Sequence, residues 1–149
     1  MGNTALLQGD KGQIKLEVID YENRQPKTIE DANWLRAILH IEAGPFSGSV
    51  NLALTTGELE LLHEKIAASG VSLKDVVDFT SMEGNLQLKV EFDRTGVASV
   101  TGIVTPDQAG ENAIQYGFHT DPITLERAAH EFGRLTSQFP VKRLIQNLT

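Results

Sequence analysis

Short runs in which apolar and polar residues alternate recur along this chain, and a period of two is typical of strands with one buried face. The first clear run is Ile14-Lys15-Leu16-Glu17-Val18. Similar runs predict further strands over residues 34–42, 46–54, 86–92, 98–104 and 114–118. Residues 71–81 are ambiguous, because they fit a helical turn at Leu73–Val76 that leads into a short strand through Val77 and Phe79. The pattern therefore predicts six or seven strands.

Two segments have the period and the end signals of helices. Thr55 and Glu58 fit a capping box, and the stripe Leu59, Leu62 and Ile66 follows, with Gly70 near the expected helix end. A second helix is predicted from the N-cap Asp121 and the N1 residue Pro122 to about Gln138. Its predicted buried stripe consists of Leu125, Ala129, Phe132 and Leu135.

The order of these elements predicts the fold class. Short connections between consecutive strands imply antiparallel pairing, and clean alternation implies one covered and one solvated face. We therefore expect an α+β protein with one curved antiparallel sheet of six to seven strands and two main helices packed on one face. A single domain is predicted over residues 14–141, with a flexible N-terminal segment over 1–13 and a C-terminal tail over 142–149.

Composition and charge narrow the function classes. The 149 residues include no Cys, which excludes disulfides, thiolate metal sites and Cys nucleophiles. The formal charge of 13 − 20 = −7 disfavours binding to a polyanion such as nucleic acid. No apolar run approaches the roughly 18 residues of a membrane span, and the N-terminus lacks signal-peptide features. We expect a cytoplasmic protein that does not contact membranes.

The sequence carries no complete catalytic or metal-binding motif. His63-Glu64 and His130-Glu131 begin like a zinc-protease helix, but Ala67 and Arg134 stand where the second His is needed. Neither a phosphate-binding loop of the GK[ST] type nor a G-x-S-x-G elbow occurs. We assign no catalytic, cofactor-binding or metal residue, and expect a protein that is not an enzyme.

The predicted first long helix offers a candidate contact face. If its apolar stripe faces the core, the opposite side carries Glu60, Leu61, Glu64 and Ala68. An apolar residue between two carboxylates suits a protein partner, and an acidic domain is steered toward basic partners. We predict these four residues as the partner-binding site.

Several segments, in order and spacing, resemble the WapI-type family of small bacterial immunity proteins of polymorphic and contact-dependent toxin systems. The similarity covers roughly Ile14 to Val141. The matching segments are Asp31-Ala32-Asn33-Trp34-Leu35, Phe46-Ser47-Gly48, Thr55–Leu59, Glu83 ahead of Leu86-x-Leu88-x-Val90, Gly96, Gly102, Phe118-x-x-Asp121-x-x-x-Leu125 and Phe139-Pro140. The resemblance implies a protein that binds and blocks a toxin domain, and it supplies no active-site residues.

The leading hypothesis is therefore an immunity-type protein that neutralises a toxin domain, such as a basic nuclease domain, by steric and electrostatic occlusion. One alternative is a homo-oligomeric scaffold, for example a homodimer, because the strand Trp34–Ile41 is apolar on both faces. A nucleic-acid or small-molecule binding module that uses a concave sheet face is the other alternative. The sequence alone leaves these alternatives open.

Overall fold

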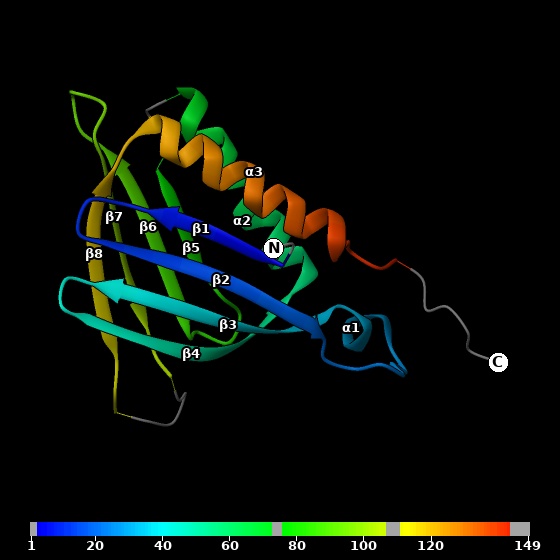
Figure 1. The fold of residues 1–149 in the computed structure, drawn as a ribbon. Coiled ribbons are helices and arrows are strands. Elements are labelled where there is room, and N and C mark those ends of the chain that lie inside the picture. Colours follow the sequence, from blue (N-terminus) through cyan, green and yellow to red (C-terminus); the bar gives the residue numbers. More distant parts are fainter. Residues whose placement is uncertain (1–2, 73–75, 107–110, 144–149) are drawn as a thin grey trace.

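The computed structural model describes residues 3–72, 76–106 and 111–143 of the chain. Four strands and a helix of 17 residues occur twice in succession (Figure 1). The first set is β1 (Thr4–Gln8), β2 (Gly12–Tyr21), β3 (Trp34–Ala43), β4 (Phe46–Thr55) and α2 (Thr56–Ser72), with the short helix α1 (Ile29–Ala32) between β2 and β3. The second set is β5 (Val77–Thr80), β6 (Leu86–Phe92), β7 (Ala98–Val104), β8 (Ile114–Thr120) and α3 (Pro122–Gln138).

The strands form two sheets, which corrects the prediction of a single curved sheet of six to seven strands. Each sheet has four antiparallel strands in sequence order, β1-β2-β3-β4 and β5-β6-β7-β8. The α+β class, the antiparallel pairing and the two main helices are confirmed. Alternation shows that one face of a strand is covered but not what covers it, and here each sheet lies largely against the other, with strands crossing (Figure 1). The prediction placed both helices on one face of a single sheet; instead α3 packs against α2 and β1, and α2 also contacts β4 and β5, one strand of each sheet.

The segment predicted to be a flexible N-terminus contains β1, so that prediction is wrong for Thr4–Gln8. Ala5 and Leu7 are completely buried, and β1 pairs with β2 in the register Ala5↔Leu16. The run is too short, and too close to the polar turn that follows, for alternation to stand out. Of the predicted tail, residues 144–149 lie outside the described residues.

The two sheets meet where the β1–β2 turn reaches β8. The Asp10 N–H donates to the His119 carbonyl at 2.9 Å, and the His119 N–H donates to Asp10 Oδ1 at 2.8 Å. A side chain at Gly9 would overlap the Phe118 ring, so glycine permits this approach. The buried core is continuous from one sheet through this junction to the other.

The strand that is apolar on both faces is central, because β3 lies between β2 and β4. Its inner side chains, such as Leu39, are buried, and Ile38 on the outer face is half-buried. On the same outer face, His40 Nδ1 lies 2.8 Å from Ser49 Oγ and His40 Nε2 lies 2.9 Å from Glu17 Oε1. On the outer face, the His40 side chain of β3 is therefore in contact with side chains of both neighbouring strands, β2 and β4.

Both long helices begin as predicted. The Thr55 N–H donates to Glu58 Oε1 at 2.9 Å and the Glu58 N–H donates to Thr55 Oγ1 at 3.1 Å, which is a complete capping box. The other carboxylate oxygen of Glu58 accepts from the Met82 N–H at 2.7 Å, so the cap also anchors the β5–β6 turn. The helix continues two residues past Gly70, to Ser72.

The α3 cap leads to a pH-dependent prediction. Asp121 accepts from the Thr124 N–H at 2.8 Å, and hydrogen bonds led by the Thr124 backbone lower the pKa of its carboxyl. A carboxyl with a lowered folded-state pKa stabilises the protein above its unfolded-state pKa, and this stability is lost as pH falls through the folded-state value. We expect Asp121→Ala to cost about 1 kcal/mol at pH 7.

The matched control is Asp121→Asn, which keeps the cap without the charge. It should cost less than the alanine variant at pH 7, and its stability should fall less than that of the native chain as pH falls below about 4. Urea unfolding monitored by circular dichroism over this pH range measures both effects. Equal losses for Asn and Ala at pH 7 would contradict the cap assignment.

Candidate functional site

All four residues of the predicted partner-binding site lie exposed on α2. Glu60, Leu61, Glu64 and Ala68 are solvent-exposed, and Leu61 retains 43% of its accessible surface. The predicted buried stripe is confirmed, since Leu59, Leu62 and Ile66 are at most 2% exposed. The structure therefore places the four side chains away from the core, on the outside of one helix.

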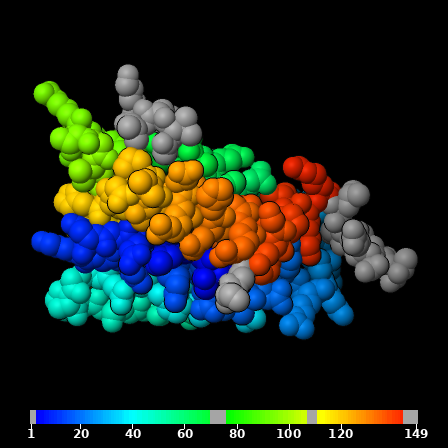
Figure 2. Space-filling view, turned by 45° about the horizontal axis from the view of Figure 1, so that its top comes forward, coloured from blue at the N-terminus to red at the C-terminus, as the bar shows by residue number. Residues whose placement is uncertain are grey.

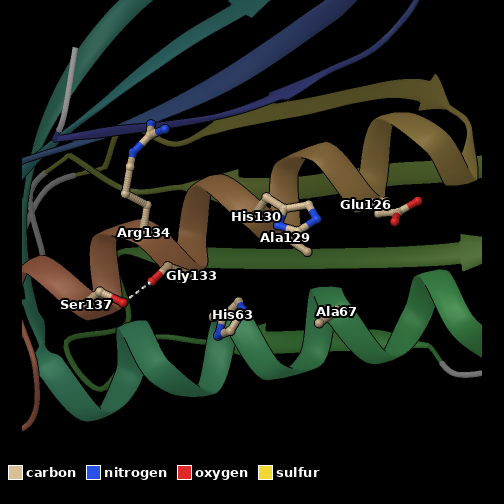
Figure 3. A pocket seen from close by; sticks show the side chains of 8 residues that line it. All are labelled: His63, Ala67, Glu126, Ala129, His130, Gly133, Arg134 and Ser137. Carbon is tan, nitrogen blue, oxygen red and sulfur yellow. Dashed lines mark hydrogen bonds between the residues drawn. The ribbon is translucent and has the colours of Figure 1, made fainter.

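A groove between α2 and α3 borders this face and was not predicted. It has a volume of about 570 Å³, and its walls consist mainly of small and polar side chains (Figure 3). Its lining residues are His63, Ala67, Glu126, Ala129, His130, Gly133, Arg134 and Ser137. The one feature of the sequence that could have indicated this groove is Gly133, a glycine inside the second predicted helix. A Cβ at this position would lie 2.9 Å from His63 Nε2, so glycine allows the His63 imidazole to lie against α3.

The two His-Glu dipeptides lie on different helices, His63-Glu64 on α2 and His130-Glu131 on α3. His63 points from α2 toward α3, whereas His130 is on α3 (Figure 3). Glu131 accepts from the Leu6 N–H at 2.9 Å, so this carboxylate is bound to β1. In the part of the chain that the structure describes, no three His, Asp or Glu side chains converge as metal ligands.

A larger cleft lies beside β4, on the side of the molecule formed by the two sheets. Its volume is about 720 Å³. One wall is the outer face and edge of the first sheet, including Ile38, Asn51 and Ala53, and the opposite wall includes Asn85, just before β6, and Pro106, just after β7. Sequence reasoning missed this cleft, because it depends on which strand ends the first sheet.

A third hollow, near the β1–β2 turn, contains Asp10 and His119. The Asp10 carboxylate is engaged by backbone donors, and the His119 N–H is the largest cause of the lowered pKa of this carboxyl. His119 Nδ1 lies 3.8 Å from Asp10 Oδ2. These contacts join the two sheets, so we assign the pair a structural role.

No helix among the described residues is long and apolar enough to cross a bilayer. In the space-filling view, α3 forms a ridge between α2 and the N-terminal strands (Figure 2). The exposed face of α2 and the α2–α3 groove thus lie on the helical side of the molecule, and the β4 cleft is built from the sheets.

Comparisons with solved structures show where the same fold occurs. The fold is similar to the crystal structure of WHY1 from Arabidopsis thaliana, with a TM-score of 0.52, 10% identity, and coverage of 93% of this chain and 84% of that chain. It is also similar to crystal structures of Trypanosoma bruciei MRP1/MRP2, with a TM-score of 0.50, 9% identity, and coverage of 91% and 85%. At these identities the likeness shows the fold alone.

The sequence itself gives the family. Residues 5–140 match the immunity protein WapI-like family, and the chain belongs to this family. The match confirms the resemblance carried by the motifs and extends it to include β1. No curated protein matches the sequence.

Proposed function

We propose that this protein binds a toxin domain and neutralises it by occluding the toxin's functional surface, with the exposed face of α2 as the contact site. The observation that supports this most is membership of the WapI-like immunity family over residues 5–140. An immunity protein needs an accessible surface more than reactive groups, because blocking a site requires only tight and specific contact.

The α2 face has the features of such a contact. Leu61 supplies an exposed apolar side chain, and Glu60 and Glu64 flank it with negative charge. The net charge of −7 raises the rate of encounter with a basic surface. A basic toxin surface, such as one that binds a polyanionic substrate, is therefore the complementary partner.

The test is co-expression with a candidate toxin domain chosen from the genes next to this one, together with a binding measurement on the purified pair. Reversing both charges with Glu60→Lys and Glu64→Lys should weaken binding by about 100-fold and abolish protection, because close interfacial charge pairs contribute several kcal/mol. Fluorescence anisotropy or calorimetry measures the change in Kd, and growth of toxin-expressing cells measures protection.

The matched control reverses two exposed carboxylates elsewhere, Glu30→Lys and Glu111→Lys, and gives the same net charge of −7 + 4 = −3. It should slow association slightly and retain protection, because it changes only the long-range field. If both double variants lose protection equally, α2 is not the contact site. If the native chain neither binds nor protects against the neighbouring toxin, the proposed function is wrong.

A further inference from the structure

Exposed sheet edges offer unpaired N–H and C=O groups to other strands, and proteins usually block them. The β1 edge is blocked by α3: Glu131 Oε1 accepts from the Leu6 N–H at 2.9 Å, and Arg134 Nη2 donates to the Thr4 carbonyl at 3.1 Å. Glu131 and Arg134, the two charged side chains of α3 in these contacts, are thus both bound to the backbone of β1. Nothing can add to β1 without displacing the helix.

The edges of the second sheet are short or partly occupied. β5 has only four residues, and Lys65 Nζ donates to the Asp78 carbonyl at 2.7 Å. β8 is met by the β1–β2 turn, where the Asp10 N–H donates to the His119 carbonyl at 2.9 Å. Of the β8 edge, only the backbone groups before His119 therefore remain open to another strand.

The β4 edge differs from these three. It is ten residues long, FSGSVNLALT, and contains no charged residue and no proline. The Thr55 N–H donates to Glu58 and not to β3, and hydrogen-bonding direction alternates along an antiparallel strand. The backbone groups of Ser47, Ser49, Asn51 and Ala53 therefore also point away from β3, and among the described residues nothing bonds to them.

We infer that β4 is a dimerisation edge: two copies of this chain pair antiparallel through β4 about a two-fold axis between Ser49 and Asn51. The two first sheets then form one continuous sheet of eight strands, twice the four of each copy. In this register Ser47 lies opposite the partner's Ala53, and Ser49 lies opposite the partner's Asn51. The small and neutral side chains allow close approach of two chains that each carry a charge of −7.

The charges beside β4 are complementary in this register. Glu42 lies next to Ser47 across β3–β4, and Arg36 lies next to Ala53, on the same outer face. Both side chains are exposed, and within the described residues neither forms an ion pair. The two-fold axis brings Glu42 of each copy to the same row as the partner's Arg36, with only small side chains between them. This pairing occurs twice per dimer, as two-fold symmetry requires.

The apolar surfaces are complementary as well. Phe46 is 76% exposed although it begins a strand, and no atom would contact a Cβ at Gly48 within 4 Å, so this end of the hairpin projects beyond its own core. The proposed register places Phe46 opposite the partner's Leu54, and both side chains lie on the inner face of the sheet, the face that carries Val50 and Leu52. Both sides of this apolar contact belong to the same strand, and this self-complementarity favours a second copy over an unrelated strand.

Sedimentation velocity of the full chain, up to roughly 300 µM, tests the inference and does not depend on the toxin. We expect a dimer whose proportion rises with concentration. Ser49→Pro removes an N–H that points away from β3, so it should give a folded monomer. Gln115→Pro on the β8 edge is the matched control and should leave the dimer unchanged.

The charge pair gives a second, independent readout. Arg36→Glu should raise the dimer dissociation constant by roughly tenfold, because it replaces two attractive pairs by two repulsive ones. The double variant Arg36→Glu with Glu42→Arg should restore the native value. A chain that stays monomeric at every concentration overturns the inference, as does a dimer that survives Ser49→Pro or a charge reversal that the double variant does not rescue.

Discussion

Replacing Gly102 by alanine is expected to lower the free energy of unfolding by about 3 kcal/mol, because the added methyl group has no space inside the second sheet. A Cβ at this position of β7 would overlap both the Tyr116 ring and the Gln87 carbonyl. Tyr116 is only 3% exposed and its hydroxyl donates to the Gln87 carbonyl at 3.3 Å, so the ring cannot move aside without losing burial and this bond. Urea unfolding measured by tryptophan fluorescence and circular dichroism gives the loss.

Gly117→Ala is the matched control, in the neighbouring strand of the same sheet. The atoms nearest to its added Cβ are the Val100 carbonyl at 3.5 Å and Thr101 Cγ2 at 3.6 Å, which are ordinary contacts. Since alanine also reduces the entropy of the unfolded chain, the change should lie within about 0.5 kcal/mol or be slightly stabilising. Equal losses for the two variants would show that the Tyr116 contact does not determine the need for glycine.

The elements could be predicted from the sequence because their signals are local. Alternation identified β2 to β4 and β6 to β8 but left β5 ambiguous, and the capping residues at Thr55 and Asp121 located the starts of both long helices. The division into two sheets could not be predicted in this way. A strand buried by another sheet and a strand buried by a helix have the same alternation, so the pattern does not specify the covering layer.

The repeated order of strands and a helix is visible in the predicted elements except for β1, but no repeat is visible in the residues themselves. Equivalent elements of the two halves share only the general pattern of buried and exposed positions. Since many different side chains satisfy such a pattern, two structural halves can match without sequence similarity. The short strand β1 was missed for a related reason: Ala5 and Leu7 alone make too short a run, and burial by α3 completes the element.

The candidate site was predictable only in part. The exposed side of α2 follows from its own periodicity, so Glu60, Leu61 and Glu64 were located correctly on the surface. The α2–α3 groove and the cleft beside β4 arise between segments distant in sequence. The open edge of β4 depends on strand order, which places β3 inside the sheet and β4 at its border.

Asn33→Ala is the second substitution expected to have a large effect, a loss of about 3 kcal/mol, because one side chain holds three segments together. Asn33 Oδ1 accepts from Thr56 Oγ1 at 2.6 Å and from the Lys142 N–H at 2.7 Å. Its Nδ2 donates to the Ile29 carbonyl at 2.8 Å and to the Lys142 carbonyl at 2.9 Å. Removing the amide leaves donors and acceptors of α1, the start of α2 and the chain after α3 without partners.

The matched control is Asn85→Ala, whose amide makes a single bond to the Thr105 carbonyl at 3.0 Å and should cost about 1 kcal/mol. Asn33→Asp should fall between the two, since it keeps the accepting oxygen and loses the donors. The Asn33 variants should also be cut faster by trypsin after Lys142, because the asparagine binds both backbone groups of that residue. The assignment is contradicted if Asn33→Ala lowers the free energy of unfolding no more than Asn85→Ala does, or if trypsin cleavage after Lys142 stays slow. Asn33 would then not hold the three segments together.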